Sequence, residues 1–462
     1  MTEHHDDPFE AAYAAGVPHA EEAPDAELRV GLAPAEAVAL KGCVLTPEEA
    51  LDPGYVVIDG SVITAVQGRA PDGVPVTDTG GVITPGLIDL HGHPEFNVFA
   101  AWEPPQLFVN RYAWRGSDLY HRLVRDPQNV LLEALPPWTQ LRYAEVRALV
   151  GGVTAIQGAG QQATRYQAEA LVRNVDKVIF GRQVGRAMID LPSGSRGMDS
   201  MTSILKGIAG GTVKAFYVHL AEGASSNQRS VAELGHLSDL GGLTPATVLI
   251  HGTALSEDQL GDVRDAGAKL VWSPQSNLRL YAETTKAAHA LALGIPVGLG
   301  ADWLPSGSTS LLAEMKVARR CLTDQSGSDP GARRLVDMVT RDAARIAGLE
   351  DELGTLAAGR PADLAVFERR QEDPWESVAA ADPSSVQLVM IGGDVAYGQA
   401  ALVGAMFDEQ ALAHFEPQLA WGKPMLLDTG YQGHPSGESP PPLSALRADL
   451  IKAFPQVGPI FA

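Results

Sequence analysis

The chain has 462 residues, of which 45% are hydrophobic, and a formal net charge of -21 at pH 7. A chain of this length and apolar content can bury a sizeable core, so we expect a soluble globular protein. Its negative charge would repel phosphate backbones and anionic lipid, which argues against nucleic acid or a membrane as partner. The two cysteines, Cys43 and Cys321, are too few for a disulfide framework or a cysteine-rich zinc site.

The first 27 residues are acidic and rich in alanine, and they lack the basic start and apolar core of a secretion signal. We interpret residues 1–27 as a disordered arm on a cytoplasmic protein. Residues 28–84 then read as short β-rich pieces separated by turns, with Asp59 and Gly60 as a hairpin signal between two apolar runs. A similar β-rich texture returns in residues 351–400.

Between these flanks, strand-like apolar runs alternate with helical patterns. The runs cover residues 87–90, 153–157, 178–180, 213–220, 247–250, 269–272 and 296–299, and an eighth is expected within residues 184–191. In residues 310–322, apolar side chains recur at three- and four-residue spacing, which predicts a helix with one core face.

Several of these runs end in side chains that can bind metal or move protons. His91 and His93 follow the first run, and alternate residues of an extended segment point to the same side. His219, His251 and Asp302 lie at the carboxyl ends of three later runs. Because catalytic groups of a (β/α)8 barrel gather at the carboxyl ends of its strands, this pattern predicts a metal site there.

Five segments together resemble the metal-dependent amidohydrolase superfamily: 85–93 (PGLIDLHGH), 219–222 (HLAE), His251, 273–277 (SPQSN) and 298–302 (GLGAD). They are most similar to its branch of cytosine, guanine and S-adenosylhomocysteine-type deaminases. The resemblance implies an α/β fold, with a TIM-like (β/α)8 barrel at residues 85–350. It also implies a small β-sandwich that both flanks, 28–84 and 351–400, build together.

Residues 401–462 form a C-terminal extension that carries no motif, with a helix expected at 442–454. The extension either covers the barrel or forms a contact between copies of the chain, so a homo-oligomer is one of two expectations.

The resemblance also implies roles for individual residues. His91, His93, His219 and Asp302 are the expected metal ligands, and Asp302 doubles as the acceptor of the water proton. Glu222 is the expected acid that protonates a ring nitrogen or leaving group. His251 is expected to contact the attacking hydroxide or the developing oxyanion.

Binuclear members of the superfamily carry a bridging carboxylated lysine on the strand before that of His219. Lys214 lies on the strand of His219 itself and Lys177 precedes its own strand, so we expect one divalent ion. Zinc is the first choice, and iron, manganese or nickel would also suit imidazole and carboxylate ligands.

Residues 94–150 are too long for a plain connection between a strand and a helix. This segment carries Trp102, Arg111, Trp114 and Arg115, and a loop after a barrel strand lies at the pocket rim. The aromatic residues either form a small core of their own or contact substrate. The arginines are candidates to clamp a carboxylate, because a guanidinium binds that group with two parallel hydrogen bonds.

The sequence therefore predicts a hydrolase for a small substrate with a carbon–nitrogen bond outside peptides. Deamination of a heterocycle by a metal-activated hydroxide is the first expectation. Hydrolysis of a cyclic or side-chain amide is the alternative within the same chemistry. A barrel that binds metal or a small molecule without catalysis is the alternative of another class.

Overall fold

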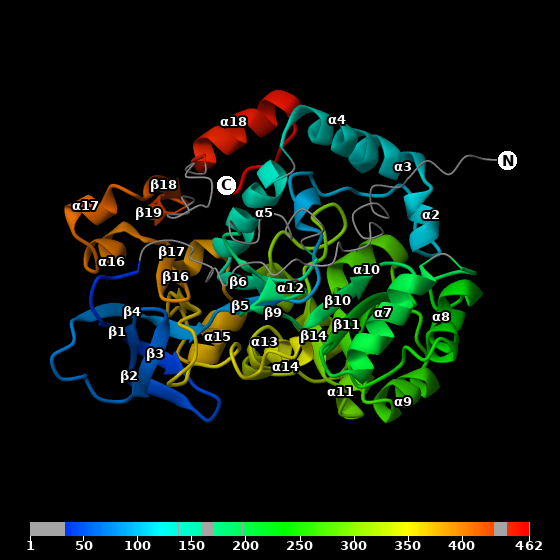
Figure 1. The fold of residues 1–462 in the computed structure, drawn as a ribbon, viewed down its shortest axis with the longest axis horizontal. Coiled ribbons are helices and arrows are strands. Elements are labelled where there is room, and N and C mark those ends of the chain that lie inside the picture. The colour runs from blue at the N-terminus through cyan, green and yellow to red at the C-terminus, as the bar shows by residue number, and fades with distance from the viewer. Residues whose placement is uncertain are drawn as a thin grey trace.

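The computed structural model of the protein describes residues 33–136, 138–158, 170–176, 178–195, 197–428 and 441–461. These residues form a β-rich part, whose strands are drawn mainly in blue and orange in Figure 1, and an α/β part, drawn mainly in cyan to yellow. The expected arm at residues 1–27 and Lys177 lie outside the described residues.

One nine-stranded sheet forms the β-rich part, in the order β18-β19-β17-β16-β15-β4-β1-β2-β3. Its strands are β1 (Val38–Leu45), β2 (Ala50–Asp59), β3 (Val62–Gln67), β4 (Val76–Pro85), β15 (Leu364–Phe367), β16 (Val386–Ile391), β17 (Asp394–Gln399), β18 (Glu416–Ala420) and β19 (Lys423–Leu427). The flanks of the chain meet where β15 pairs antiparallel with β4. A separate β-rich part is thus confirmed. Its strands form one continuous sheet where two stacked sheets were expected, and β18 and β19 extend it past residue 400.

Alternation of side chains explains how this sheet packs on two sides. In β15, Leu364 and Val366 join the apolar cluster of the β-rich part, whereas Ala365 and Phe367 join the large cluster that continues into the α/β part. In β4, Ile83 and Val82 divide in the same way. Because successive side chains of a strand point to opposite faces, a sheet with two buried faces needs such uninterrupted apolar runs.

The α/β part contains two parallel sheets. The first has the order β5-β6-β7 and the second the order β10-β11-β12-β13-β14. Their strands are β5 (Leu87–Asp89), β6 (Val153–Ile156), β7 (Arg173–Asn174), β10 (Gly185–Met188), β11 (Ala215–Leu220), β12 (Thr247–His251), β13 (Lys269–Trp272) and β14 (Val297–Leu299). All neighbouring pairs in these sheets are parallel.

Both parallel sheets contribute to one apolar cluster, which includes Ile88, Ala155, Val175, Tyr217 and Val248. Beside this shared core, the amide of Leu90, just after β5, donates to the carbonyl of Leu299 in β14 at 3.2 Å. This arrangement is a TIM-barrel-like α/β fold. Among the described residues, the strand ladders remain two separate sheets and do not close a continuous barrel.

The prediction that residues 178–180 form a barrel strand is wrong. Residues Val178–Ile179 form β8, which pairs antiparallel with β9 (Arg182–Gln183) in a sheet of their own. Phe180 and Gly181 between them have φ values of 51° and 70°, the left-handed backbone that a tight two-residue hairpin needs. The neighbour of β6 is β7 instead. The eighth strand expected within residues 184–191 is β10.

Helices follow most strands of the α/β part: α7 (Met198–Ala209), α8 (Gln228–Asp239), α9 (Glu257–Asp265), α10 (Pro274–Tyr281), α11 (Ala287–Ala292), α12 (Leu311–Ser326), α13 (Ala332–Met338) and α14 (Arg341–Ala347). The helix expected at 310–322 corresponds to α12, and its apolar residues are buried. Shorter helices of the β-rich part are α15 (Pro374–Ala379), η4 (Pro383–Ser385), α16 (Ala400–Gly404) and α17 (Glu409–Leu412).

The long segment 94–150 folds into its own helices: η1 (Pro94–Phe96), α2 (Arg111–Arg115), α3 (Asp118–Tyr120), η2 (His121–Arg125), α4 (Asp126–Ala134) and α5 (Trp138–Leu149). The expected helix at 442–454 is α18 (Leu443–Ala453), which lies beside α4 and α5 at the top of Figure 1. Phe454 packs its ring against Phe99 at 5.4 Å between centroids, so the extension covers the long segment. No helix among the described residues is long and apolar enough to cross a membrane.

Candidate active site

The predicted metal ligands lie at the carboxyl ends of three parallel strands. His91 and His93 follow β5, His219 is the fifth residue of β11, and Asp302 follows β14. His251 ends β12 between them. Each of these side chains is at most 5% exposed. The structure therefore brings together every residue that the sequence placed at the ends of these strands.

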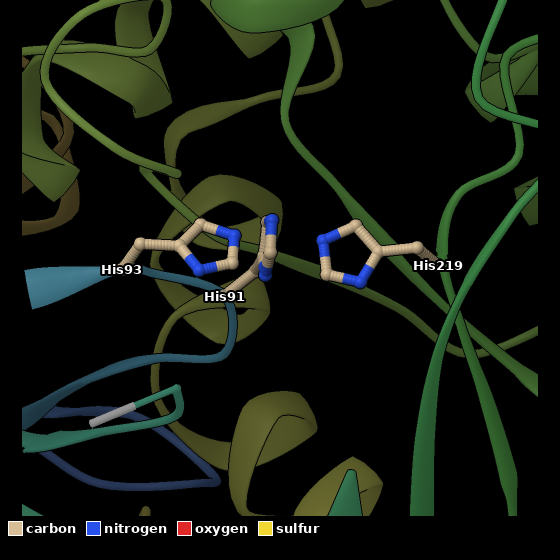
Figure 2. Close-up of side chains that lie close together, drawn as sticks. All are labelled: His91, His93 and His219. Carbon is tan, nitrogen blue, oxygen red and sulfur yellow. The ribbon is translucent and has the colours of Figure 1, made fainter. Parts of the chain in front are cut away.

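The imidazole rings lie within contact of one another. The ring centroid of His91 is 5.0 Å from that of His93, 4.8 Å from that of His219 and 5.0 Å from that of His251. Figure 2 shows His91 between the rings of His93 and His219. Asp302 completes the group, with its Oδ1 at 3.3 Å from Nε2 of His91 and 3.8 Å from Nε2 of His93.

A glycine allows Asp302 to approach His91 so closely. A Cβ atom built on Gly300 would lie 2.4 Å from Cβ of His91, which no side chain could tolerate. With glycine there, the backbone after β14 passes directly beside His91, and the amide of Asp302 donates to the carbonyl of His91 at 2.9 Å. The motif GLGAD thus serves the geometry of the site as well as its chemistry.

Two site residues have a left-handed backbone. His251 has φ of 69° and Asp302 has φ of 60°, values that side chains with a Cβ rarely adopt. Such conformations cost roughly 1–3 kcal/mol each and persist only where the surrounding structure holds them. Around His251, the hydroxyl of Thr285 donates to the carbonyl oxygen of this residue. Strain concentrated at these two positions is a feature of functional sites.

Burial and neighbouring charge give the side chains the protonation states that a metal needs. Burial, helped by the charge of His91, lowers the pKa of His93 to about 3. Burial likewise holds the pKa of His219 well below its usual value and lowers that of His251. Burial opposes ionisation of Asp302, but the attraction of His91 and its hydrogen bond outweigh it and lower the pKa of Asp302.

The pKa of His91 shifts in the other direction. Burial lowers it, but the neighbouring charge of Asp302 and a hydrogen bond to that carboxylate raise it more. A divalent ion between these side chains would favour the neutral imidazole instead, because a metal and a proton compete for the same nitrogen.

The donor set fits a divalent cation. His91, His93 and His219 place ligand atoms within 4.8 Å of one another, and so do His91, His251 and Asp302. Within the described residues, Nδ1 of His91 and Nδ1 of His219 are buried without a hydrogen-bond partner. Unpaired buried polar atoms are rare and costly, so they suggest a bound group. Neutral imidazoles with a carboxylate suit zinc, iron, manganese or nickel.

Lys214 is exposed and precedes the first residue of β11. It lies five positions before His219, which on an extended strand amounts to roughly 16 Å at about 3.3 Å per residue. Lys214 is therefore not placed to bridge two metals beside His219.

Glu222 and His251 lie beside His219, with side-chain ligand atoms of the three residues within 4.8 Å of one another. Oε2 of Glu222 is 3.7 Å from Nε2 of His251, and its Oε1 accepts a hydrogen bond of 2.6 Å from the hydroxyl of Tyr281. The side-chain amide of Asn277 lies 3.4 Å from Nδ1 of His251 and also donates to Thr253 at 2.8 Å. These contacts fix the directions of the expected acid, Glu222, and of His251, which is expected to contact the hydroxide or the oxyanion.

One pocket opens onto this group, and its lining consists of His93, Arg111, Trp114, Arg115, Ile189, His219, Glu222, His251, Asp302 and Trp303. The long segment thus contributes Arg111, Trp114 and Arg115 to the wall. Trp102 lies one layer behind, with its ring 6.2 Å from that of Trp114 and 5.3 Å from that of Trp303. Trp102 thus packs among other aromatic rings, and Trp114 reaches the pocket. Contact of these residues with substrate stays a prediction.

The guanidinium of Arg111 donates hydrogen bonds to three other residues of the protein. Its Nε donates to Asp190 at 2.9 Å, its Nη1 to Glu233 at 2.8 Å and its Nη2 to the hydroxyl of Tyr112 at 2.7 Å. Glu233 in turn accepts from the amide of Ala221 at 2.7 Å, so this network supports the turn between His219 and Glu222. Arg115 donates to the other oxygen of Asp190 at 2.7 Å.

Sequence reasoning missed Ile189 and Trp303, which line the pocket, and Tyr281, which contacts Glu222. Trp303 directly follows Asp302, and its amide donates to Oδ1 of that residue at 2.7 Å. Its adjacency to a predicted ligand was a usable signal. No comparable signal existed for Tyr281, because it meets Glu222 only through the tertiary fold.

Comparison with known proteins agrees with this geometry. The model of the Amidohydrolase family matches residues 204–396. A 5-methylthioadenosine/S-adenosylhomocysteine deaminase of Desulforudis audaxviator is 25% identical over 377 residues, which cover 74% of this chain and 86% of that protein. An 8-oxoguanine deaminase of Pseudomonas aeruginosa is 28% identical over 190 residues, which cover 38% of this chain and 42% of that protein.

Among solved structures, an adenosine deaminase from Xanthomonas campestris with bound zinc superposes with a TM-score of 0.60 at 18% identity, covering 80% of this chain and 96% of that one. That likeness shows the shared fold. Residues 204–396 thus form an amidohydrolase family domain, and the names of the relatives support its deaminase-like branch. The protein is accordingly a hydrolase that acts on carbon–nitrogen bonds.

Proposed function

We propose that the protein hydrolytically deaminates an amino-substituted heterocycle, with one divalent ion held by His91, His93, His219 and Asp302. The observation that carries this proposal is the buried group in which these ligands adjoin Glu222 and His251, and most of its members line one pocket. Zinc is the proposed ion, because imidazole and carboxylate ligands suit it and a similar fold binds it.

The relatives support the reaction class. Their names describe removal of an amino group from 5-methylthioadenosine, S-adenosylhomocysteine or 8-oxoguanine, all of which carry the amine on a purine ring. Trp114 and Trp303 line the pocket of this chain, and flat indole surfaces suit a planar ring. We therefore place the heterocycle between the metal ligands and these indoles.

His91, His93, His219 and Asp302 would hold the ion, which would supply a Lewis acid and so make a water acidic enough to lose a proton near neutral pH. Asp302 accepts that proton while the oxygen attacks the carbon that bears the amino group. Glu222 delivers a proton to the adjacent ring nitrogen. His251 donates a hydrogen bond to the oxygen on which charge develops. Asp302 returns its proton to the amino group, the carbon–nitrogen bond breaks and ammonia leaves. The hydroxyl on the same carbon becomes a carbonyl by giving its proton to Glu222, which restores the acid.

Arg115 is the proposed recognition residue of the rim. It lines the pocket and is paired with Asp190, so its guanidinium is held in a defined direction. Arg111 lines the same wall, but Asp190, Glu233 and Tyr112 already take its donors. We propose that Arg115 contacts a polar group on the substrate and that Arg111 holds the wall in place.

Two measurements test this function. Elemental analysis of the purified protein should find one divalent ion per chain, and two ions would contradict the proposed ligand set. The metal-loaded protein should then be assayed on purines, pyrimidines, cyclic amidines and N-acyl compounds for both ammonia and a new carboxylate. Ammonia without a carboxylate is the expected result. Ring opening or acid release would replace deamination by amide hydrolysis, and no turnover would contradict the proposal.

A further inference from the structure

We infer that Tyr281 is a positioning residue that holds one oxygen of Glu222 and leaves the other to transfer the proton. Its hydroxyl donates to Oε1 of Glu222 at 2.6 Å and lies 3.0 Å from Nε1 of Trp114. This inference rests on the proposed function, because it assigns a task to each oxygen of the proposed acid.

The direction of these hydrogen bonds follows from the chemistry of the three groups. An indole N–H can only donate, so the hydroxyl oxygen of Tyr281 accepts from Trp114. The hydroxyl hydrogen is then directed at Oε1 of Glu222. At 2.6 Å this is the short contact expected of a hydroxyl that donates to a carboxylate. Trp114 also lies 3.4 Å from the same Oε1, which adds a second, weaker donor.

The two oxygens of Glu222 therefore have different surroundings. Oε1 is occupied as an acceptor from Tyr281 and Trp114. Oε2 is 3.7 Å from Nε2 of His251, on the side of the proposed metal group. A proton that Glu222 passes to substrate is best carried on Oε2, because a proton on Oε1 would displace the hydrogen bond from Tyr281.

One helix positions both Glu222, the proposed acid, and His251, the proposed hydrogen-bond donor to the oxyanion. Asn277 and Tyr281 lie four residues apart on α10, which places them on the same face of the helix. The amide of Asn277 lies 3.4 Å from Nδ1 of His251, and the hydroxyl of Tyr281 contacts Glu222. Asn277 and Tyr281 are at most 3% exposed. A rigid, buried helix face thus fixes the separation between Glu222 and His251.

The test compares Tyr281→Phe with Tyr217→Phe in the metal-loaded enzyme. Tyr217 is a matched control, because it is fully buried in β11 and its hydroxyl has no hydrogen-bond partner among the described residues. Tyr281→Phe should lower kcat about 10-fold or more with KM and metal content unchanged, as expected when a reacting group is misplaced. Tyr217→Phe should retain the wild-type kcat.

A double-mutant cycle separates positioning from a general structural effect. In Glu222→Gln, which has no proton to deliver, adding Tyr281→Phe should change kcat by less than about twofold. Independent losses that multiply, or a wild-type kcat in Tyr281→Phe, would overturn the inference. So would a loss confined to KM.

Crystal structures of metal-loaded wild type and Tyr281→Phe give a readout that needs no substrate. The carboxylate of Glu222 should rotate, or occupy more than one orientation, once the hydroxyl is removed. If the Glu222 carboxylate kept the same orientation in Tyr281→Phe, the inference would be overturned, whatever the activity of the enzyme. If the wild type turns over nothing in the substrate panel, the proposed function fails, and these structures still decide whether Tyr281 positions Glu222.

Discussion

Arg173 and Asp363 form a buried ion pair that joins the α/β part to the β-rich part. Nε of Arg173 donates to Oδ2 of Asp363 at 2.7 Å, and its Nη2 donates to Oδ1 at 2.9 Å. Oδ1 also accepts from the amide of Gly392 at 2.8 Å, and the carbonyl of Asp363 accepts from the amide of Gly86 at 3.0 Å. Because Gly86 precedes β5, this aspartate anchors the strand that leads to His91, which agrees with a structural role for Asp363.

Breaking this pair should destabilise the protein strongly. Arg173→Met would leave the Asp363 carboxylate buried without its cation, and such a loss costs about 3–5 kcal/mol. Denaturant unfolding of the metal-loaded protein measures the change. Arg320→Met is the matched control, since Arg320 is 79% exposed and pairs with Asp324 on the surface. The control should change the free energy of unfolding by less than about 1 kcal/mol, and an equal loss in both variants would contradict the prediction.

Removal of one metal ligand should lower the metal content and abolish turnover. His219→Ala takes away a buried imidazole from the proposed ligand group, so elemental analysis should find less metal and the assay no hydrolysis. His236→Ala, in an exposed position on α8, should retain both. Full metal content together with full turnover in His219→Ala would show that the ligand assignment is wrong.

Glu222→Gln should separate metal binding from catalysis. The amide keeps the shape of the carboxyl and an acceptor for Tyr281 but cannot deliver a proton. We expect full metal content and a loss of kcat of roughly 100-fold or more, within the range of general acid catalysis. The comparison is Glu257→Gln, an exposed residue of the first turn of α9. Wild-type rates in Glu222→Gln would assign the proton to water or to another residue.

Glu145 should make the stability depend on pH. Burial raises the pKa of this carboxyl, on α5, to about 7 from its usual value of 4.5. The unfolded chain therefore releases the proton at lower pH than the folded protein does, and the free energy of unfolding falls as pH rises from 4.5 to 7. A shift of this size corresponds to about 3 kcal/mol.

Glu145→Gln should remove this part of the pH dependence, measured as urea unfolding of the metal-loaded protein at several pH values. Glu133→Gln is the control, because Glu133 is exposed on α4. If the stability of Glu145→Gln declined with rising pH as steeply as that of Glu133→Gln, the carboxyl of Glu145 would not be the cause.

The two arginines of the rim should respond differently to substitution. Arg115→Met should raise KM with little effect on folding, since Arg115 is proposed to contact substrate. Arg111→Met should lower the melting temperature as well, because it leaves Glu233 buried without the cation that pairs with it at 2.8 Å. Thermal unfolding and steady-state kinetics of both variants check this division. A raised KM in Arg111→Met with an unchanged melting temperature would reverse the proposed roles.

The sequence determined the parts of this protein that depend on local pattern. Continuous apolar runs predicted most parallel strands, and the polar residue after each run marked the carboxyl end of the strand, where parallel topology gathers His91, His219, His251 and Asp302. The three- and four-residue spacing of apolar side chains predicted α12 and α18. Helical periodicity, too, is a pattern of residues that are close in sequence.

Only the tertiary structure decided which short segments join the barrel-like sheets. Val178–Ile179 has the composition of a strand, yet the left-handed turn at Phe180 and Gly181 folds it into a hairpin, and the polar pair Arg173–Asn174 takes the place beside β6. Such short strands gain their stability from their neighbours rather than from their own composition. The same holds for side-chain partners. Arg111 with Glu233 and Tyr281 with Glu222 meet across 122 and 59 residues of sequence, and no local pattern encodes a contact that packing alone creates.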